Sequence, residues 1–136
     1  MLAELLITCT LLSPLTPEQV TNYQDCKDRN AIIIHMEEFI PTITKYFKKE
    51  DHETAIRIAF CESSGRPNVI NGNTDGTKDV GLWQFNDRTW TWLKPKLKIT
   101  SPRTNVEVST AVASWLFYND GSHHWKPSEH CWSFKS

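Results

Sequence analysis

Residues 71–86, NGNTDGTKDVGLWQFN, place a run of turn-forming residues directly before a short apolar segment. Asparagine, aspartate and glycine favour tight turns, so this stretch predicts a small sheet-like element. Its polar half carries two acids, Asp75 and Asp79, and its apolar half is interrupted by Gln84 and Asn86. The segments on both sides have helical patterns. The sequence therefore predicts a mixed α+β fold that is mainly α, with one short β-hairpin segment.

The segment before the hairpin is predicted to be a helix that ends in an acid. Asp51 is a candidate N-cap for the residues HETAIRIAFCE at 52–62. Ala55, Ile58 and Ala59 recur at helical spacing and predict the buried face of this helix. Glu62 then lies at the end of an apolar helix.

Two more helices are predicted upstream. Thr16 can cap the first, Pro17 suits its first position, and its pattern predicts that it runs to Ile40, before Pro41. The second is expected over residues 42–50. The apolar side chains expected to face the core in this region are those of Ile32, Ile33, Ile34 and Phe39.

A helix after the hairpin is predicted to begin at a capping box formed by Thr104 and Glu107. Its apolar residues recur at the i, i+3, i+4, i+7 and i+8 spacing of a buried face. They are Val108, Ala111, Val112, Trp115 and Leu116.

Glu62 and Asp79 are predicted to lie in unlike surroundings. Burial of the helix end would raise the pKa of Glu62, whereas the Asn, Thr and Gly groups around Asp79 can hydrogen-bond an ionised carboxylate. Cleavage of a glycosidic bond needs such a pair, because one acid protonates the leaving oxygen and the other stabilises or attacks the anomeric carbon. The two residues are therefore candidate catalytic groups.

The segment from Cys61 to Trp90, CESSGRPNVINGNTDGTKDVGLWQFNDRTW, resembles the active-site segment of the c-type lysozymes. In that family a helix-terminal Glu-Ser is followed by N-x-N-T-D-G-[ST]-x-D, then by G-[IL]-x-Q-[IF]-N and a nearby Trp. The present chain has these positions in the same order without a gap. The resemblance implies a lysozyme-like fold in which the hairpin lines a glycan cleft. It implies Glu62 as the general acid and Asp79 as the nucleophile or electrostatic stabiliser.

The resemblance also implies which other residues contact the substrate. Asn73, Gln84 and Asn86 would orient the catalytic acids or the N-acetyl group of a sugar, and Trp90 would also bind substrate. The expected activity is that of a lysozyme-type glycoside hydrolase, which cleaves the β-1,4 bond between N-acetylmuramic acid and N-acetylglucosamine in peptidoglycan. That chemistry needs no metal or organic cofactor, so none is expected.

The C-terminal part, AVASWLFYNDGSHHWKPSEHCW at residues 111–132, is similar instead to lytic transglycosylases and phage muralytic domains. The Tyr118-Asn119-Asp120-Gly121 element matches one that completes the site in those domains, which makes Tyr118 a candidate substrate-binding residue. In transglycosylases one glutamate suffices, because the 6-hydroxyl of the substrate attacks and leaves an anhydro-sugar. Asp79 favours hydrolysis and Tyr118 keeps transglycosylation open. A third interpretation is a non-catalytic glycan-binding or structural virion protein, against which the presence of both acids argues.

The four cysteines are interpreted as two different kinds of pair. The resemblance to muralytic domains implies a disulfide between Cys61 and Cys131, which would hold the helix end that carries Glu62. In a reducing compartment the same two residues would be a packed thiol pair. Cys9 and Cys26 are interpreted as buried thiols.

A zinc site is not expected in the histidine-rich tail, where a solvated loop is predicted. The histidines and the cysteine of the tail are possible zinc ligands, but they lack the paired spacing of a structural zinc site. They are His123, His124, His130 and Cys131.

Residues 1–50 have no counterpart in the families that the chain resembles. They are predicted to form a helical extension packed on the domain or on a partner, and residues 51–136 the lysozyme-like catalytic domain. Residues 1–15, MLAELLITCTLLSPL, lack a basic start and are too short to span a bilayer as a helix. Their apolar residues recur at helical spacing, so a helix docked on its own domain or on a protein partner is expected. Membrane association and an atypical export signal stay open. The apolar positions are Leu2, Leu5, Leu6, Cys9 and Leu12.

The composition of the 136 residues is that of a soluble globular chain, with 39% apolar and 23% charged residues. A formal net charge of -1 gives no indication of nucleic-acid binding. The expected partners are peptidoglycan glycan strands and, through residues 1–15, a virion or a membrane. The protein is expected to act outside the cytoplasm, either secreted or carried by a virion.

Overall fold

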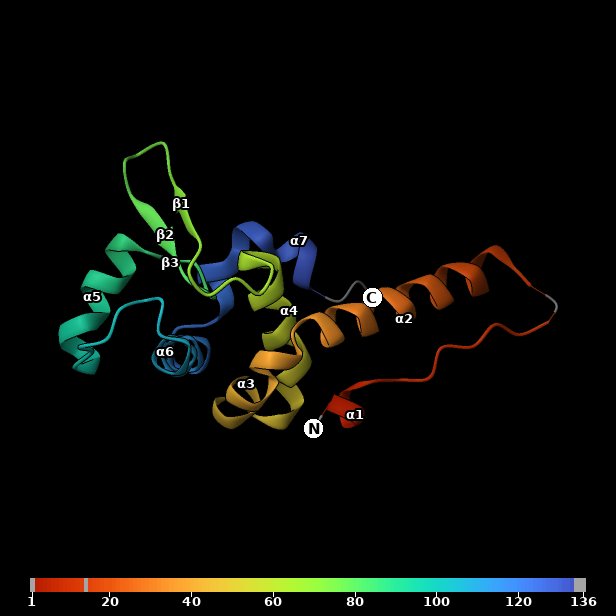
Figure 1. The fold of residues 1–136 in the computed structure, drawn as a ribbon. Coiled ribbons are helices and arrows are strands. Elements are labelled where there is room, and N and C mark those ends of the chain that lie inside the picture. The colour runs from red at the N-terminus through yellow and green to blue at the C-terminus, as the bar shows by residue number, and fades with distance from the viewer. Residues whose placement is uncertain (1, 14, 134–136) are drawn as a thin grey trace.

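The structure is a computed structural model that describes residues 2–13 and 15–133 (Figure 1). The described chain is mainly helical with one small antiparallel sheet, which confirms the predicted α+β class. The helices are α1 (Leu2–Leu5), α2 (Pro17–His35), α3 (Ile40–Tyr46), α4 (His52–Ser63), α5 (Asp87–Leu97), α6 (Val106–Asn119) and α7 (Glu129–Trp132). The 3-10 helices are η1 (Glu37–Phe39), η2 (Lys49–Asp51) and η3 (Ser122–Ser128), and the strands are β1 (Ile70–Gly72), β2 (Lys78–Val80) and β3 (Phe85–Asn86).

The sheet forms where the turn-rich stretch predicts it. Its strands lie in the order β1-β2-β3, and both pairs are antiparallel. Asp79 on the central strand pairs with Asn71 on one side and with Asn86 on the other. The predicted hairpin at residues 71–86 is therefore confirmed, and its register places amide side chains beside an acid.

One hydrophobic core extends from Ile33 on α2 to Trp132 on α7, and α4 contributes to its centre. Ala55, Ile58 and Ala59 are fully buried, as their spacing predicts. Helix α4 contacts α2, α3, η3 and α7, so the helix that ends in the candidate acid is held from several directions.

Helix α2 ends earlier than its pattern predicts. It stops at His35 rather than Ile40, and the chain turns through η1 before α3 begins. Pro41 lies in the first turn of α3, where the missing N–H costs nothing. Ile33 and Met36 are buried at helical spacing, and Ile34 lies off that face, so the prediction for Ile34 is wrong and its side chain is 54% exposed.

Helix α6 is capped by a different residue from the one predicted. Asn105 is its N-cap and accepts a hydrogen bond from the backbone N–H of Val108, so the capping box of Thr104 and Glu107 is wrong. Val112 and Leu116 are buried as predicted. Val108 and Trp115 are partly buried and pack against the core. These two residues, together with Ala111 and Val112, also border a surface cavity.

The N-terminal segment is helical only over α1. Leu2, Leu5 and Leu6 pack against the core of the same chain, but Leu12 is 65% exposed, so the single helix predicted over this segment is wrong. Residues 1 and 14, which belong to the predicted segment, lie outside the described residues.

Residues 7–9 run along α2 and are bonded to it. The side chain of Asn30 donates to the carbonyl of Ile7 and accepts from its N–H. Cys9 forms a disulfide with Cys26, with Cα atoms 5.8 Å apart, which corrects the interpretation of these two residues as thiols. No helix among the described residues is long and apolar enough to cross a bilayer.

Candidate active site

Glu62 lies in the last turn of α4, and this turn is fixed by covalent and hydrogen bonds. Ser64 ends the helix in the left-handed conformation, and the buried hydroxyl of Ser63 donates to the carbonyl of Ala59. The expected disulfide between Cys61 and Cys131 is present, with Cα atoms 6.0 Å apart. Arg57, one turn earlier, donates to the Cys131 and Trp132 carbonyls. The helix end is therefore tied to α7.

Asp79 is oriented by two asparagine side chains. The Nδ2 atoms of Asn73 and Asn86 donate to Oδ1 of Asp79 at 3.1 and 2.9 Å. The hydroxyl oxygen of Thr77 accepts from the same two amides. Two donors on one oxygen restrict the rotation of the carboxyl group. Asn73 and Asn86 thus lie where the resemblance implies, beside the second acid.

Glu62 and Asp79 line one cavity of about 240 Å³, although 17 positions separate them in the chain. Gln84 and Asn86 border it from the sheet side, and η3 closes the opposite side. The remaining lining residues are Phe85, Thr89, His124, Trp125 and Pro127. The fold therefore brings the two acids of the sequence prediction to a shared hollow.

The surroundings of Glu62 favour its protonated form. Burial raises the pKa of this carboxyl above its usual range. A hydrogen bond with the Ser128 hydroxyl lowers it by less, and the negative charge of Asp79 raises it by a smaller amount still. A carboxyl with a raised pKa can serve as a general acid. The cavity thus holds a candidate proton donor and a hydrogen-bonded second carboxyl group.

Gln84 is held rigidly at the floor of the cavity. Its side-chain amide donates to the carbonyls of Val69 and Gly81, and its oxygen accepts from Asn71. Gly81 has φ +91°, and a Cβ there would collide with the carbonyl of Arg103. The turn between β2 and β3 therefore requires glycine, and it sets the position of Gln84.

Two predicted substrate contacts lie elsewhere. Trp90 is 7% exposed and packs on the ring of Phe85, so it supports the cavity from the core instead of facing a sugar. The hydroxyl of Tyr118 donates to Asp51 at 2.6 Å and accepts from the N–H of Lys48. Tyr118 does not line the cavity, and burial together with Asp51 raises the pKa of its phenol to about 12.

His124 and Trp125 border the cavity but were not predicted as site residues. Trp125 is buried, and its indole N–H donates to the carbonyl of Trp83. Both follow the Tyr118–Gly121 element, so the similarity to muralytic domains was a signal for this segment. Their spacing alone could not have revealed that the tail folds back over α4.

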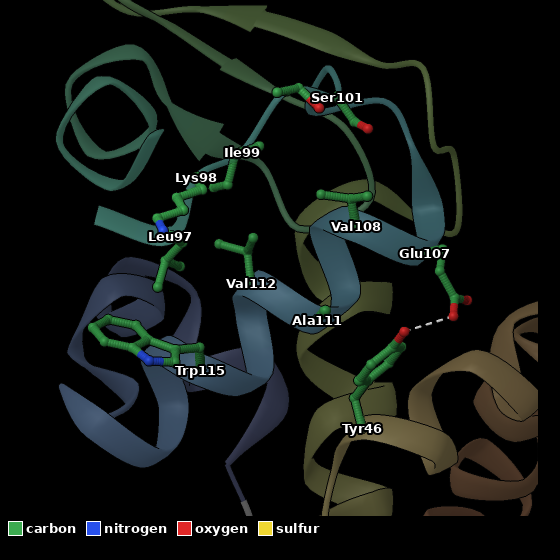
Figure 2. Close-up of a pocket in the computed structure, with 11 residues that line it drawn as sticks. Tyr46, Leu97, Lys98, Ile99, Ser101, Glu107, Val108, Ala111, Val112 and Trp115 are labelled. Carbon is green, nitrogen blue, oxygen red and sulfur yellow. Dashed lines mark hydrogen bonds between the residues drawn. The ribbon is translucent and has the colours of Figure 1, made fainter. Parts of the chain in front are cut away.

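A larger cavity of about 350 Å³ lies between α6 and residues 97–101 (Figure 2). Its borders are mostly apolar, with Leu97, Val112 and Trp115 on facing sides. Glu107 is the one acid among its lining residues, and it already accepts from Lys45 and Tyr46, which lower its pKa. A single acid that is paired with a lysine cannot supply the two-carboxylate chemistry, so of these two cavities the smaller is the candidate active site.

The comparison with protein families agrees with this geometry. Residues 43–129 match the model of the family described as "Lysozyme like domain", and the matched range includes both acids. The chain therefore belongs to the lysozyme-like domain family. This membership identifies it as an enzyme of glycosidic bonds that acts on peptidoglycan and hence outside the cytoplasm. Comparisons with curated proteins and with solved structures found no match.

Proposed function

We propose that the protein is a muramidase, which hydrolyses the β-1,4 bond between N-acetylmuramic acid and N-acetylglucosamine in peptidoglycan. The observation that carries this proposal is the shared cavity of Glu62 and Asp79, where burial raises the pKa of one acid and two amides hold the other. Membership of the lysozyme-like domain family supports the substrate class.

In the proposed reaction Glu62 donates its proton to the glycosidic oxygen as the bond to the anomeric carbon breaks. Asp79 stabilises the positive charge that develops on the sugar, or attacks the anomeric carbon to form a covalent intermediate. Water then adds to that carbon and returns its proton to Glu62, which restores both groups. The Asn73 and Asn86 amides keep the oxygen of Asp79 aimed during both steps.

Lytic transglycosylation is the main alternative, since it needs only one acid. It would leave the two amides that hold Asp79 without a catalytic purpose. The location of Tyr118 outside the cavity also removes the feature that favoured it. A non-catalytic role would give no use to the raised pKa of Glu62. Hydrolysis uses all these features, so we favour it.

The products distinguish the two reactions. Purified peptidoglycan digested with the wild-type protein should give muramic acid ends that contain the added water, as seen by mass spectrometry. Asp79→Asn should lower the rate of release by on the order of a hundredfold or more, because the developing charge loses its carboxylate. Asp28→Asn on the exposed face of α2 is the matched control and should keep the wild-type rate. If Asp79→Asn releases products at a normal rate and these products are one water lighter, the reaction is transglycosylation and the proposed hydrolysis is wrong.

We further propose that residues 1–50 form an extension that attaches the catalytic domain of residues 51–136 to a virion or membrane partner. Leu11, Leu12 and Leu15 are 45%, 65% and 58% exposed, which provides an apolar contact away from the cavity. The boundary itself is not a break in packing, because Ile40 and Ile43 belong to the same core as α4. A Leu11→Ser, Leu12→Ser variant should cleave soluble glycan fragments normally but sediment less with whole envelopes. Unchanged sedimentation would contradict the proposed attachment.

A further inference from the structure

Three side chains with metal-binding atoms meet where α6 passes into η3. They are Asp120, His123 and His124, and one ligand atom of each lies within 4.8 Å of the others. The Nε2 atom of His124 is 2.7 Å from Oδ2 of Asp120, and the Nε2 atom of His123 is 3.5 Å from the same oxygen. Two imidazoles therefore present the same ring nitrogen to a single carboxylate oxygen.

The backbone sets this arrangement. Gly121 has φ +88°, a left-handed conformation that favours glycine, and it turns the chain back immediately after α6. The two imidazole rings then lie with centroids 4.2 Å apart and planes 31° apart, so their edges face the same way. A side chain at position 121 would strain the turn that brings both rings to Asp120.

We propose that Asp120, His123 and His124 bind a divalent transition-metal ion of the zinc type. Two imidazole nitrogens and one carboxylate oxygen are ligands that zinc accepts, and three protein ligands leave a coordination position for water. With the proton of each ring on Nδ1, both Nε2 lone pairs point at the place where the ion would bind. The ion would then replace the protons that otherwise lie between the rings and the carboxylate.

Charge and competing groups also favour a cation at this place. Asp120 is an acid between two imidazoles, and the nearest lysine in the chain, Lys126, pairs with Glu129. All four cysteines are bonded as disulfides, so no thiolate competes for the ion. The sequence predicts no zinc site for the group His123, His124, His130 and Cys131. Cys131 is bonded to Cys61 and cannot be a ligand, whereas Asp120 was not part of that group.

The bound ion would affect the candidate active site through His124. The side chain of His124 is 18% exposed and lines the same cavity as Glu62 and Asp79. A cation fixed on that wall opposes the positive charge that develops on the sugar during bond cleavage. Zinc is therefore expected to inhibit cleavage, and this consequence, unlike the binding, rests on the proposed function.

Binding is best tested without reference to activity, by titrating the intact Glu62→Gln protein with Co²⁺ and recording its visible absorption. We expect one equivalent of Co²⁺ to give a ligand-field band, which one equivalent of Zn²⁺ removes. His124→Ala and Asp120→Asn, introduced separately, should each weaken the binding by roughly tenfold or more, because each removes a ligand. His130→Ala is the matched control, since His130 lies nearby but outside the cluster, and it should bind as tightly as its parent.

Absence of the band, or equal Co²⁺ affinity in the His124→Ala and parent proteins, would overturn the metal site. Equal loss in the His130→Ala control would also overturn it, because the ion would then be bound elsewhere on the tail. A protein that binds Co²⁺ as expected but has no activity on peptidoglycan would contradict the muramidase proposal and leave the metal site standing. The two proposals can therefore fail separately.

Discussion

The chain has two parts that differ in packing. The N-terminal arm comprises residues 2–13 and 15–32, and the domain comprises residues 33–133. Each part contains one disulfide. None of the described residues of the arm is buried, and in Figure 1 the N-terminal end of α2 extends away from the helices and the sheet of the domain. From Ile33 onward every element except η2 and β1 contributes buried apolar residues. Cys9–Cys26 joins segments 17 residues apart, whereas Cys61–Cys131 joins segments 70 residues apart.

This difference shows that the same covalent bond can have separate purposes within one chain. In the arm the disulfide replaces a core, because the segment it holds buries little apolar surface. In the domain it joins two elements that already pack together, α4 and α7, and it does so one residue before Glu62. The first bond therefore maintains the local shape of the arm, and the second holds the helix end that carries Glu62 in the candidate active site.

Removal of each disulfide in turn tests this distinction, and loss of the Cys61–Cys131 bond should have the larger effect on stability. A Cys61→Ser, Cys131→Ser variant loses the closure of a long loop, for which the chain-entropy estimate is about 4 kcal/mol of unfolding free energy. Because the end of α4 is freed, its cleavage rate should fall as well. Guanidinium unfolding and peptidoglycan digestion measure the two effects.

The matched variant is Cys9→Ser, Cys26→Ser in the arm. It should increase hydrogen exchange in the arm, but leave the main unfolding transition and the cleavage rate nearly unchanged. If both double variants lower the global stability and the activity equally, the arm is an integral part of the domain and the distinction fails.

A pair of neighbouring isoleucines locates the point where the arm joins the core. Ile33 is fully buried and Ile34 is 54% exposed. Ile33→Ala should lower the unfolding free energy by about 2–5 kcal/mol through the cavity it leaves. Ile34→Ala should change it by about 0.5 kcal/mol or less. Chemical denaturation of both variants measures the difference, and equal costs would show that the core does not begin at Ile33.

The pH dependence of stability should give a smaller effect confined to Glu62. Its pKa is raised above the ordinary value of 4.5, so the folded state holds this proton more tightly than the unfolded state. The stability it contributes is fully present below that ordinary value and is lost as the pH rises through the folded pKa. The Glu62→Gln side chain does not ionise, so the variant does not lose this stability. Its melting temperature should therefore rise relative to wild type as the pH increases from 4.5 through the folded pKa. A constant difference over the pH range would show that Glu62 is not desolvated.

Local patterns predicted the elements whose signals are contained within a few residues. The turn residues of 71–86 predicted the sheet, and the spacing of Ala55, Ile58 and Ala59 predicted the buried face of α4. The two acids were predicted as a pair because one follows an apolar helix and the other lies among amides. Their meeting in one cavity follows the expectation from the resemblance to lysozymes.

Features that depend on distant packing were predicted less well. Apolar spacing on α6 could not reveal that Trp115 borders a second cavity, nor that Asn105 would cap the helix. The buried position of Trp90 depends on its contact with Phe85. The hydrogen bonds of Tyr118 depend on Lys48 and on Asp51, which is 67 residues away in the sequence. Such contacts form only when the chain has folded, so no local signal reports them.

The most direct test of the central claim, that Glu62 is the proton donor of a glycan-cleaving site, is the rate at which Glu62→Gln digests purified peptidoglycan. Loss of a general acid lowers rates by about a hundredfold to ten-thousandfold, and we expect a loss in that range with an intact fold by circular dichroism. Glu107→Gln, which makes the same change in the larger cavity of Figure 2, should keep most of the activity. Digestion by Glu62→Gln at the wild-type rate, or a comparable loss in Glu107→Gln, would contradict the assignment of the site.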